Sequence, residues 1–169
     1  RPGIIMSDGP IHPGTHPDSS EKIDIISGFQ VAGSDDAEMK ECIALAACPG
    51  YGSCGGMFTY NTMQTFIGVV GMEPLDMVAP ASDDPRRINE FPDALITYLK
   101  AMIDMGLTPR DIVTRDSIRN AVIVAMAVGG STNVLLHAPE IARAAGFRSF
   151  AKDVMSPGEF NHLSERVVP

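Results

Sequence analysis

The residues with the clearest potential for chemistry form a short loop that carries two of the three cysteines. Residues 48–56 read Cys-Pro-Gly-Tyr-Gly-Ser-Cys-Gly-Gly, and four glycines and a proline in nine residues cannot sustain a helix. Small residues flank Cys54 on both sides, so a bulky group can approach its thiolate. A helix is expected to begin just after Cys54, where free N–H groups would stabilise a thiolate and donate hydrogen bonds to sulfides.

The cysteine spacing leaves two interpretations open. Cys48 and Cys54 are either reactive or metal-binding thiols, or two buried side chains that act as small apolar residues in a tight turn. Five residues separate them, which matches neither a zinc ribbon nor a redox Cys-x-x-Cys motif. The four histidines are spread along the chain, so a zinc site would lack partners. A zinc or thiol-redox module is therefore the least favoured function.

A second motif lies at residues 129–133, which read Gly-Gly-Ser-Thr-Asn. Two glycines followed by Ser131 and Thr132 at the start of a helix would present N–H groups and hydroxyls to a carboxylate or phosphate. The alternative is that the glycines end one helix and Ser131 caps the next. His137 is interpreted as a hydrogen-bonded core residue rather than a catalytic one.

The elements that must position these motifs are mostly helices. An apolar run at residues 3–6 predicts a buried strand, and a second strand is expected near residues 147–150. Apolar spacing and end signals predict helices at about residues 23–33, 37–47, 57–70, 95–105, 115–128 and 131–145. Pro139 lies inside the last of these and predicts a kink or a break. The pattern indicates a helix-rich α/β layer whose sheet is partly missing from the chain.

Composition narrows the class of protein. The 169 residues suffice for one domain with a core, and the net charge of −8 argues against nucleic acid as a partner. No stretch is long and apolar enough to span a bilayer, and no signal peptide is visible. Three cysteines do not indicate a secreted disulfide scaffold and suit a reducing compartment such as the cytoplasm. A small anionic substrate can still be held by a local field.

Both motifs resemble signatures of the family that contains dihydroxy-acid dehydratase, 6-phosphogluconate dehydratase and sugar-acid dehydratases. Residues 52–63 read Gly-Ser-Cys-Gly-Gly-Met-Phe-Thr-Tyr-Asn-Thr-Met, similar to the family's Gly-Ser/Ala-Cys-Gly-Gly-Met-Tyr/Phe-Thr-Ala-Asn-Thr-Met. Residues 127–137 resemble its Ala-Leu-Gly-Gly-Ser-Thr-Asn-x-x-Leu-His segment. Residues 1–14, 23–30 and 108–121 also match, so the resemblance covers nearly the whole chain.

The resemblance implies a role for each cysteine. Cys54 would be one of three cysteines that bind an iron–sulfur cluster, of the [2Fe-2S] or [4Fe-4S] type. Cys48 would be a structural neighbour, and Cys42 a core residue. The fold would be the helix-rich part of the family's N-terminal three-layer α/β domain, with residues 1–169 a single segment of that domain and the C-terminal domain absent.

The reaction implied is the elimination of water from a 2,3-dihydroxy acid to give a 2-keto acid. Iron would act as a Lewis acid on the leaving hydroxyl and Mg²⁺ would hold the carboxylate, with Ser131 and Thr132 binding substrate. The other cluster cysteines, the Mg²⁺ carboxylates and the catalytic base are expected outside this chain, which alone would neither bind the cluster nor turn over. The full-length protein is expected to be a homo-oligomer in the cytoplasm, or in the mitochondrial or plastid matrix of a eukaryote, without nucleic-acid or membrane partners.

Several residues depart from the family signatures, and these departures bear on which substrate is bound rather than on the role of Cys54. Gly68 stands where the family carries a Glu, residues 7–10 replace the commoner Gly-Gly-Thr, residues 73–76 leave the usual pattern, and Pro139 replaces an apolar residue. A dihydroxy acid of branched-chain amino-acid biosynthesis is the expected substrate. A sugar acid is the near alternative, and a catalytically silent homologue that serves as a binding or scaffold protein is the alternative of a different class.

Overall fold

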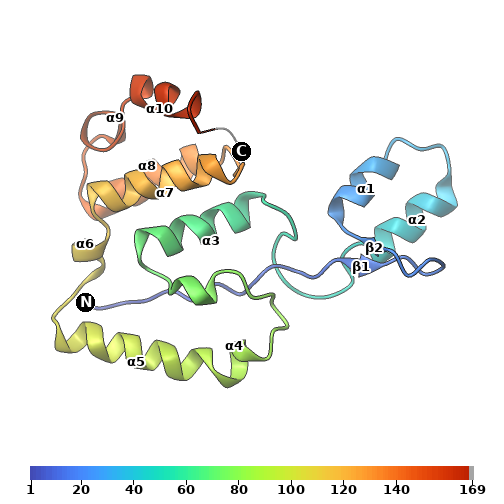
Figure 1. Cartoon of the computed structure of the whole chain (residues 1–169), viewed down its shortest axis with the longest axis horizontal. Coiled ribbons are helices and arrows are strands. Elements are labelled where there is room, and N and C mark those ends of the chain that lie inside the picture. The colour runs from blue at the N-terminus through green and yellow to red at the C-terminus, as the bar shows by residue number, and fades with distance from the viewer. Residues whose placement is uncertain (168–169) are drawn as a thin grey trace.

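The computed structural model describes residues 1–167 and has two parts joined by a narrow neck (Figure 1). One part is a body of packed helices, and the other is a small lobe formed by residues 14–47. The neck consists of residues 8–13, which lead into the lobe, and residues 48–56, which lead back to the body. Pro10 and Ser53 pair there as a parallel bridge. The cysteine loop therefore lies where the two parts meet.

The body is organised around three helices, α3 (Thr59–Val70), α7 (Arg115–Ala127) and α8 (Val134–Ala145). Alternate residues of α3 are buried, and α7 presents an apolar face to them at the 3.6-residue period. Further elements surround this centre: η1 (Leu75–Met77), α4 (Arg86–Asn89), α5 (Phe91–Asp104), α6 (Pro109–Ile112), α9 (Phe150–Asp153) and α10 (Pro157–Ser164). The shared core contains Phe66, Val70, Ile118, Ala121, Val122, Ala125, Val134, Ala138, Ala142, Val154 and Met155.

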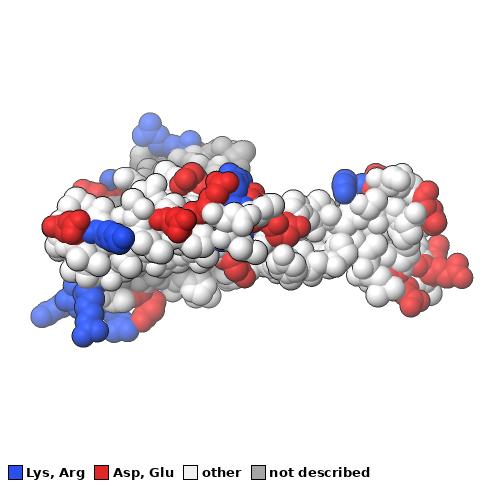
Figure 2. All heavy atoms as spheres, turned by 90° about the horizontal axis from the view of Figure 1, so that it is seen from below, with Lys and Arg blue, Asp and Glu red and all other residues white. Residues whose placement is uncertain are grey.

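The lobe holds α1 (Ile25–Val31), α2 (Ala37–Ala46) and a two-stranded antiparallel sheet of β1 (Gly14–Thr15) and β2 (Lys22–Ile23). Its helices begin at aspartate caps, Asp24 and Asp36, whose carboxylates accept from backbone N–H groups of the first turn. Its apolar cluster, among the residues described, consists of Ile23, Ile43 and Ala47. On the face seen in Figure 2, acidic side chains gather at the outer end of the lobe.

The helix-rich character with a small sheet confirms the predicted fold class. The helices predicted at about residues 37–47 and 115–128 are also confirmed, and the side chains of Asp36 and Thr114 cap their first turns. None of the helices within residues 1–167 is long and apolar enough to cross a membrane.

The two predicted strands are wrong. Residues 3–6 are extended, but only one backbone bond, from the Ile5 N–H to the Met72 carbonyl at 2.8 Å, ties them to a neighbour. Ile5 is 40% exposed, so the run is not buried either. An apolar run becomes a strand only where a second strand completes its ladder. Residues 147–150 instead lead into α9, which begins at Phe150.

Of the kink or break predicted at Pro139, the break is wrong, since α8 runs through it from Val134 to Ala145. Pro139 lies in the middle of the helix, but the carbonyl left without an N–H partner is that of Leu135, an exposed residue in the first turn that water can reach. The helix begins at Val134 rather than at Ser131.

Candidate functional site

The cysteine loop is fixed to the N-terminal segment by the residue that precedes Cys54. The Ser53 N–H donates to the Gly9 carbonyl at 3.0 Å, and the Ser53 carbonyl accepts from the Ile11 N–H at 2.9 Å. The Ser53 hydroxyl also lies 3.1 Å from both carboxylate oxygens of Asp8. Three contacts with residues about forty positions earlier thus set the path of the chain into Cys54.

Close packing explains why glycine precedes Ser53. Gly52 has a φ of 138°, and a Cβ there would lie 2.7 Å from the Ile11 nitrogen and 2.6 Å from the Ser82 hydroxyl. Any other residue would push the loop away from the segment that holds it. The Ser82 hydroxyl in turn donates to the Tyr51 carbonyl at 2.5 Å.

The backbone after Cys54 is held by Asn61 in the first turn of α3. Its side-chain nitrogen donates to the Cys54 carbonyl at 2.6 Å and to the Gly56 carbonyl at 2.5 Å. The helix predicted at about residues 57–70 is confirmed, and it begins at Thr59. Residues 55–58 turn before the helix, because Gly55 and Gly56 favour an irregular path. Contact between Cys54 and the helix is made through Asn61.

The thiols of Cys48 and Cys54 are exposed, and that of Cys42 is half-buried. The interpretation of the loop as a turn with two buried cysteines is therefore wrong. Within residues 1–167, no three or more His, Cys, Asp or Glu side chains gather in a way that could hold a metal ion. Cys54 is thus an accessible thiol that would need ligands from elsewhere to complete a metal centre.

The second motif meets the first at the start of α3. The Asn133 amide donates to the Thr59 hydroxyl at 2.6 Å, and the Ser131 N–H donates to the Thr62 hydroxyl at 2.8 Å. A Cβ at Gly130 would lie 2.9 Å from the Thr62 methyl carbon, so glycine allows this close approach. The turn before α8 is therefore anchored to the same helix turn that holds Cys54.

These contacts occupy part of the predicted anion site. The Ser131 N–H is used by Thr62, and the Ser131 hydroxyl accepts from the Asn133 N–H at 3.2 Å. Thr132 is exposed. Substrate binding by Ser131 and Thr132 stays a prediction. Of the two side chains, the exposed Thr132 hydroxyl is the more available to a substrate. His137 is exposed on α8, so its interpretation as a core residue is wrong.

The segment of residues 7–10 places one charged group, the Asp8 carboxylate, beside the loop. The Gly9 N–H donates to the Tyr60 hydroxyl at 2.6 Å. Burial raises the pKa of Tyr60 to about 12, and the negative charge of Asp8 adds to the rise. Tyr60 therefore remains a neutral phenol at physiological pH.

The glycine that departs from the family pattern has a packing reason. Gly68 is buried in α3, and a Cβ there would lie 2.7 Å from a Val78 methyl carbon and 3.1 Å from one of Leu75. No carboxylate side chain fits at this position in this chain. The buried carboxylate of this region is Glu73 instead, which is 2% exposed.

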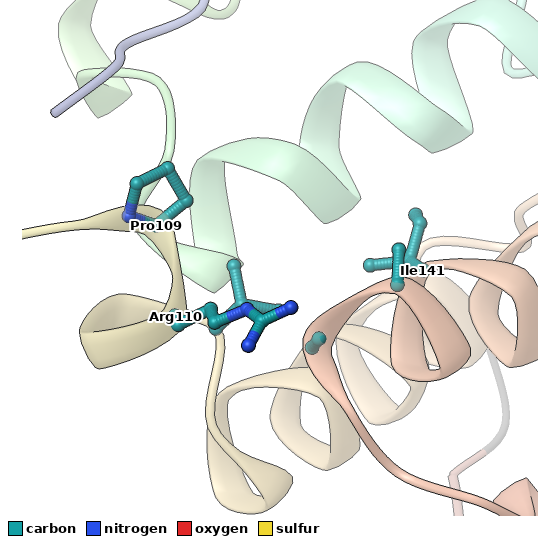
Figure 3. A pocket seen from close by; sticks show the side chains of 6 residues that line it. Pro109, Arg110 and Ile141 are labelled. Carbon is teal, nitrogen blue, oxygen red and sulfur yellow. The ribbon is translucent and has the colours of Figure 1, made fainter. Parts of the chain in front are cut away.

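The hollow beside Cys48 in the cysteine loop is small in the part of the chain that the structure describes. It has a volume of about 60 Å³ and is lined partly by Ile11, His12, Cys48 and Gly55. A larger one, of about 200 Å³, lies between α6 and α8, where Pro109, Arg110 and Ile141 line it (Figure 3). Small-molecule sites usually enclose about 300–1,000 Å³. The hollow beside Cys48 is therefore too small to enclose a hydroxy acid.

Comparison with known sequences identifies the family. Residues 1–167 match the family described as dihydroxy-acid/6-phosphogluconate dehydratase, N-terminal. The chain belongs to this family. It is 43% identical over 152 residues to the chloroplastic dihydroxy-acid dehydratase of Arabidopsis thaliana, and the match covers 86% of this chain. It is 35% identical over 175 residues to the mitochondrial dihydroxy-acid dehydratase of Saccharomyces cerevisiae, covering 98% of this chain.

A third relative is the dihydroxy-acid dehydratase of Cytophaga hutchinsonii, 34% identical with 100% of this chain covered. The chain spans only 24%, 28% and 30% of the lengths of these three relatives. The family membership confirms the resemblance carried by the Cys54 and Ser131 motifs.

Sequence reasoning missed the residues that support the motifs. Thr59, Asn61 and Thr62 stand inside the first motif, and the available signal was three polar residues within one turn at a helix start. Arg87 gave no signal because it belongs to no motif, and the only signal for Glu73 was the departure from the family pattern at residues 73–76.

Proposed function

We propose that Cys54 is one ligand of an iron–sulfur cluster in a hydro-lyase that converts a 2,3-dihydroxy carboxylic acid to a 2-keto acid. The observation that supports this most is an exposed thiol on a loop whose backbone is fixed on both sides, by Gly9 and Ile11 before it and by Asn61 after it. A metal ligand needs both accessibility and a fixed position. The dehydratase names of the relatives support the reaction class.

The residues around Cys54 leave room for a cluster bound to its thiolate. Ser53, Gly55 and Gly56 leave the thiol unobstructed, and the thiol is free of any disulfide. The cluster would need further cysteines, which we place outside residues 1–167 because the described part of the chain holds no group of metal-binding side chains. The same reasoning places the ligands of Mg²⁺ elsewhere in the complete protein.

A bound cluster would supply a Lewis-acidic iron for the leaving hydroxyl, and Mg²⁺ would hold the carboxylate and the neighbouring hydroxyl of the substrate. This chain's own residues would position the thiolate and bind the substrate. Asn61 and Ser53 fix the backbone of Cys54, while Thr132, exposed on the turn that Thr62 anchors, would donate a hydrogen bond to the substrate carboxylate. The base that removes the proton from C2 lies outside this chain.

The test replaces the cysteines one at a time in the complete protein. Cys54→Ser should lower iron and sulfide content and the visible absorption of the cluster. Cys48→Ser is the matched control, because it removes an exposed thiol from the same loop, and it should retain the cluster. Equal iron in the Cys54→Ser protein and the unchanged protein would disprove the assignment.

The substrate class is a separate question, because the family description includes both dihydroxy-acid and 6-phosphogluconate dehydratases. A branched-chain dihydroxy acid is proposed on the strength of the named relatives. Turnover of dihydroxyisovalerate by the complete protein, with an aldonate and 6-phosphogluconate as competitors, would decide between the classes. A silent homologue would turn over none of them and would lack stoichiometric iron.

The setting of the complete protein is proposed from the family as well. We expect a homo-oligomer, active in the cytoplasm or in an organelle matrix, as the chloroplastic and mitochondrial names of two relatives suggest for those proteins. Light scattering of the purified complete protein would measure the oligomeric state.

A further inference from the structure

The cysteine loop depends on the segment of residues 7–10, which itself needs an anchor. Gly9 and Asp8 hold Ser53, yet this segment belongs to no helix, and its only strand-like pairing is the isolated bridge from Pro10 to Ser53 itself. A loop segment without such support adopts many conformations unless its polar groups find fixed partners. The partners of Ser7, at the start of the segment, supply that support.

Glu73 holds Ser7 from one side. The Ser7 N–H donates to one carboxylate oxygen of Glu73 at 2.7 Å, and the Ser7 hydroxyl donates to the other at 2.6 Å. Glu73 is 2% exposed, and a buried carboxylate is tolerated only when hydrogen bonds replace its hydration. Both oxygens of Glu73 thus bind the same residue, Ser7.

Arg87 holds Ser7 from the other side. Its guanidinium donates to the Ser7 carbonyl, to the Pro80 carbonyl, and through Nε to the Ala81 carbonyl at 2.7 Å. Arg87 is 7% exposed. The N–H and the carbonyl of Ser7 are therefore bound by two buried groups of opposite charge. The guanidinium also packs against the segment, since a Cβ at Gly9 would lie 2.6 Å from its terminal nitrogen.

We infer that Glu73 is a positioning residue for the Cys54 loop: its buried carboxylate fixes Ser7, and the two residues that follow Ser7 hold Ser53. Two departures from the family signatures, at residues 7–10 and at residues 73–76, meet in this contact. The consequence for a bound cluster rests on the proposed function, whereas the positioning of Ser53 does not.

Hydrogen exchange of the complete protein tests the inference at the affected amides. In Glu73→Ala, exchange in the peptide that covers residues 50–57 should accelerate roughly tenfold relative to exchange in α7, because a buried hydrogen bond to a charged group is lost. Glu73→Gln should restore the slow rate, since its amide can accept from the Ser7 N–H and donate to the Ser7 hydroxyl. Asp76→Ala removes a nearby exposed carboxylate and should leave the rate unchanged.

Ser7→Ala provides a second variant that leaves no cavity at Glu73. It removes one of the two bonds and should accelerate exchange at residues 50–57 by a smaller factor. If Glu73→Ala does not fold, Ser7→Ala decides: an unchanged rate overturns the inference, and a local increase supports it. An equal effect of Glu73→Ala on residues 50–57 and on α7, or failure of Glu73→Gln to restore the rate, also overturns it.

Iron content measured in the same proteins separates this inference from the proposed function. Faster exchange in Glu73→Ala together with an unchanged protein that binds no iron would disprove the cluster and leave the positioning role intact. If the unchanged protein binds iron but Glu73→Ala shows no faster exchange, the positioning role is disproved and the proposed cluster is left intact. If both the cluster and the positioning role of Glu73 are correct, Glu73→Ala should lose iron to a chelator faster than Glu73→Gln.

Discussion

The body and the lobe are built from similar helices but are stabilised in different ways. The body buries large side chains between α3, α7 and α8, including Phe66 and Ile118. The lobe buries Ile23, Ile43 and Ala47, and no residue of α1 is buried. Helices without an apolar core depend on caps and on contacts with neighbours. The comparison indicates that the body can fix the geometry of the site, while the lobe contributes little to it.

The largest effect is expected in the body core. Phe66→Ala should lower the free energy of unfolding by about 3–5 kcal/mol, because it leaves a cavity where α3 packs against the other helices. Chemical denaturation monitored by circular dichroism measures this. A loss below 1 kcal/mol would show that the body core is not the stabilising element.

A smaller and local effect is expected in the lobe. Ile43→Ala should cost about 2 kcal/mol, and the loss should be confined to the amides of residues 14–47 in hydrogen exchange. Protection of α7 should not change. Equal loss of protection in both parts would contradict the separation of the lobe from the body.

The attachment of the lobe's sheet to α2 offers a third test. A Cβ at Gly14 would lie 1.5 Å from the Ala46 carbonyl oxygen, so Gly14→Ala must displace β1 or the end of α2. We expect a cost of about 1–3 kcal/mol, again limited to the lobe. Gly33→Ala is the control, because nothing lies within 4 Å of a Cβ there.

The smallest effect concerns the contact between the neck and α3, where the Gly9 N–H binds the Tyr60 hydroxyl, and it depends on pH. Tyr60 has a pKa of about 12 in the folded chain, against an ordinary value of 10.0. Because the folded pKa is the higher one, the stabilising contribution of the phenol is complete below pH 10 and is lost as the pH rises toward 12. Ultraviolet titration of the unchanged protein against Tyr60→Phe measures this ionisation. A phenol that ionises at its ordinary pKa would contradict the burial described for Tyr60.

Local signals predicted much of the fold. Asp36 and Thr114 cap helices as their positions before apolar runs indicate, and the glycine-rich cysteine segment is a loop. The strand at residues 3–6 was predicted wrongly because an apolar run does not reveal whether a partner strand exists. Pairing of that kind depends on residues distant in the sequence.

The supporting residues of the site illustrate the same limit. Arg86 and Arg87 are adjacent and chemically identical, yet Arg86 is exposed and pairs with Asp84, while Arg87 is buried among carbonyls. Nothing in the local sequence distinguishes them. The motifs around Cys54 and Ser131 were recognisable, but their meeting through Thr59 and Thr62 required the packing of α3 against α7 and the turn that follows it.

The bridge between Pro10 and Ser53 has a consequence for how this chain can vary in length. The chain leaves the body and returns to it at nearly the same point, so everything between is topologically an insertion. The entropy of closing such an excursion grows only with the logarithm of its length, by about 0.6 kcal/mol for each doubling. Residues could therefore be added to or removed from the lobe at small thermodynamic cost, while the path of the chain into Cys54 stayed the same.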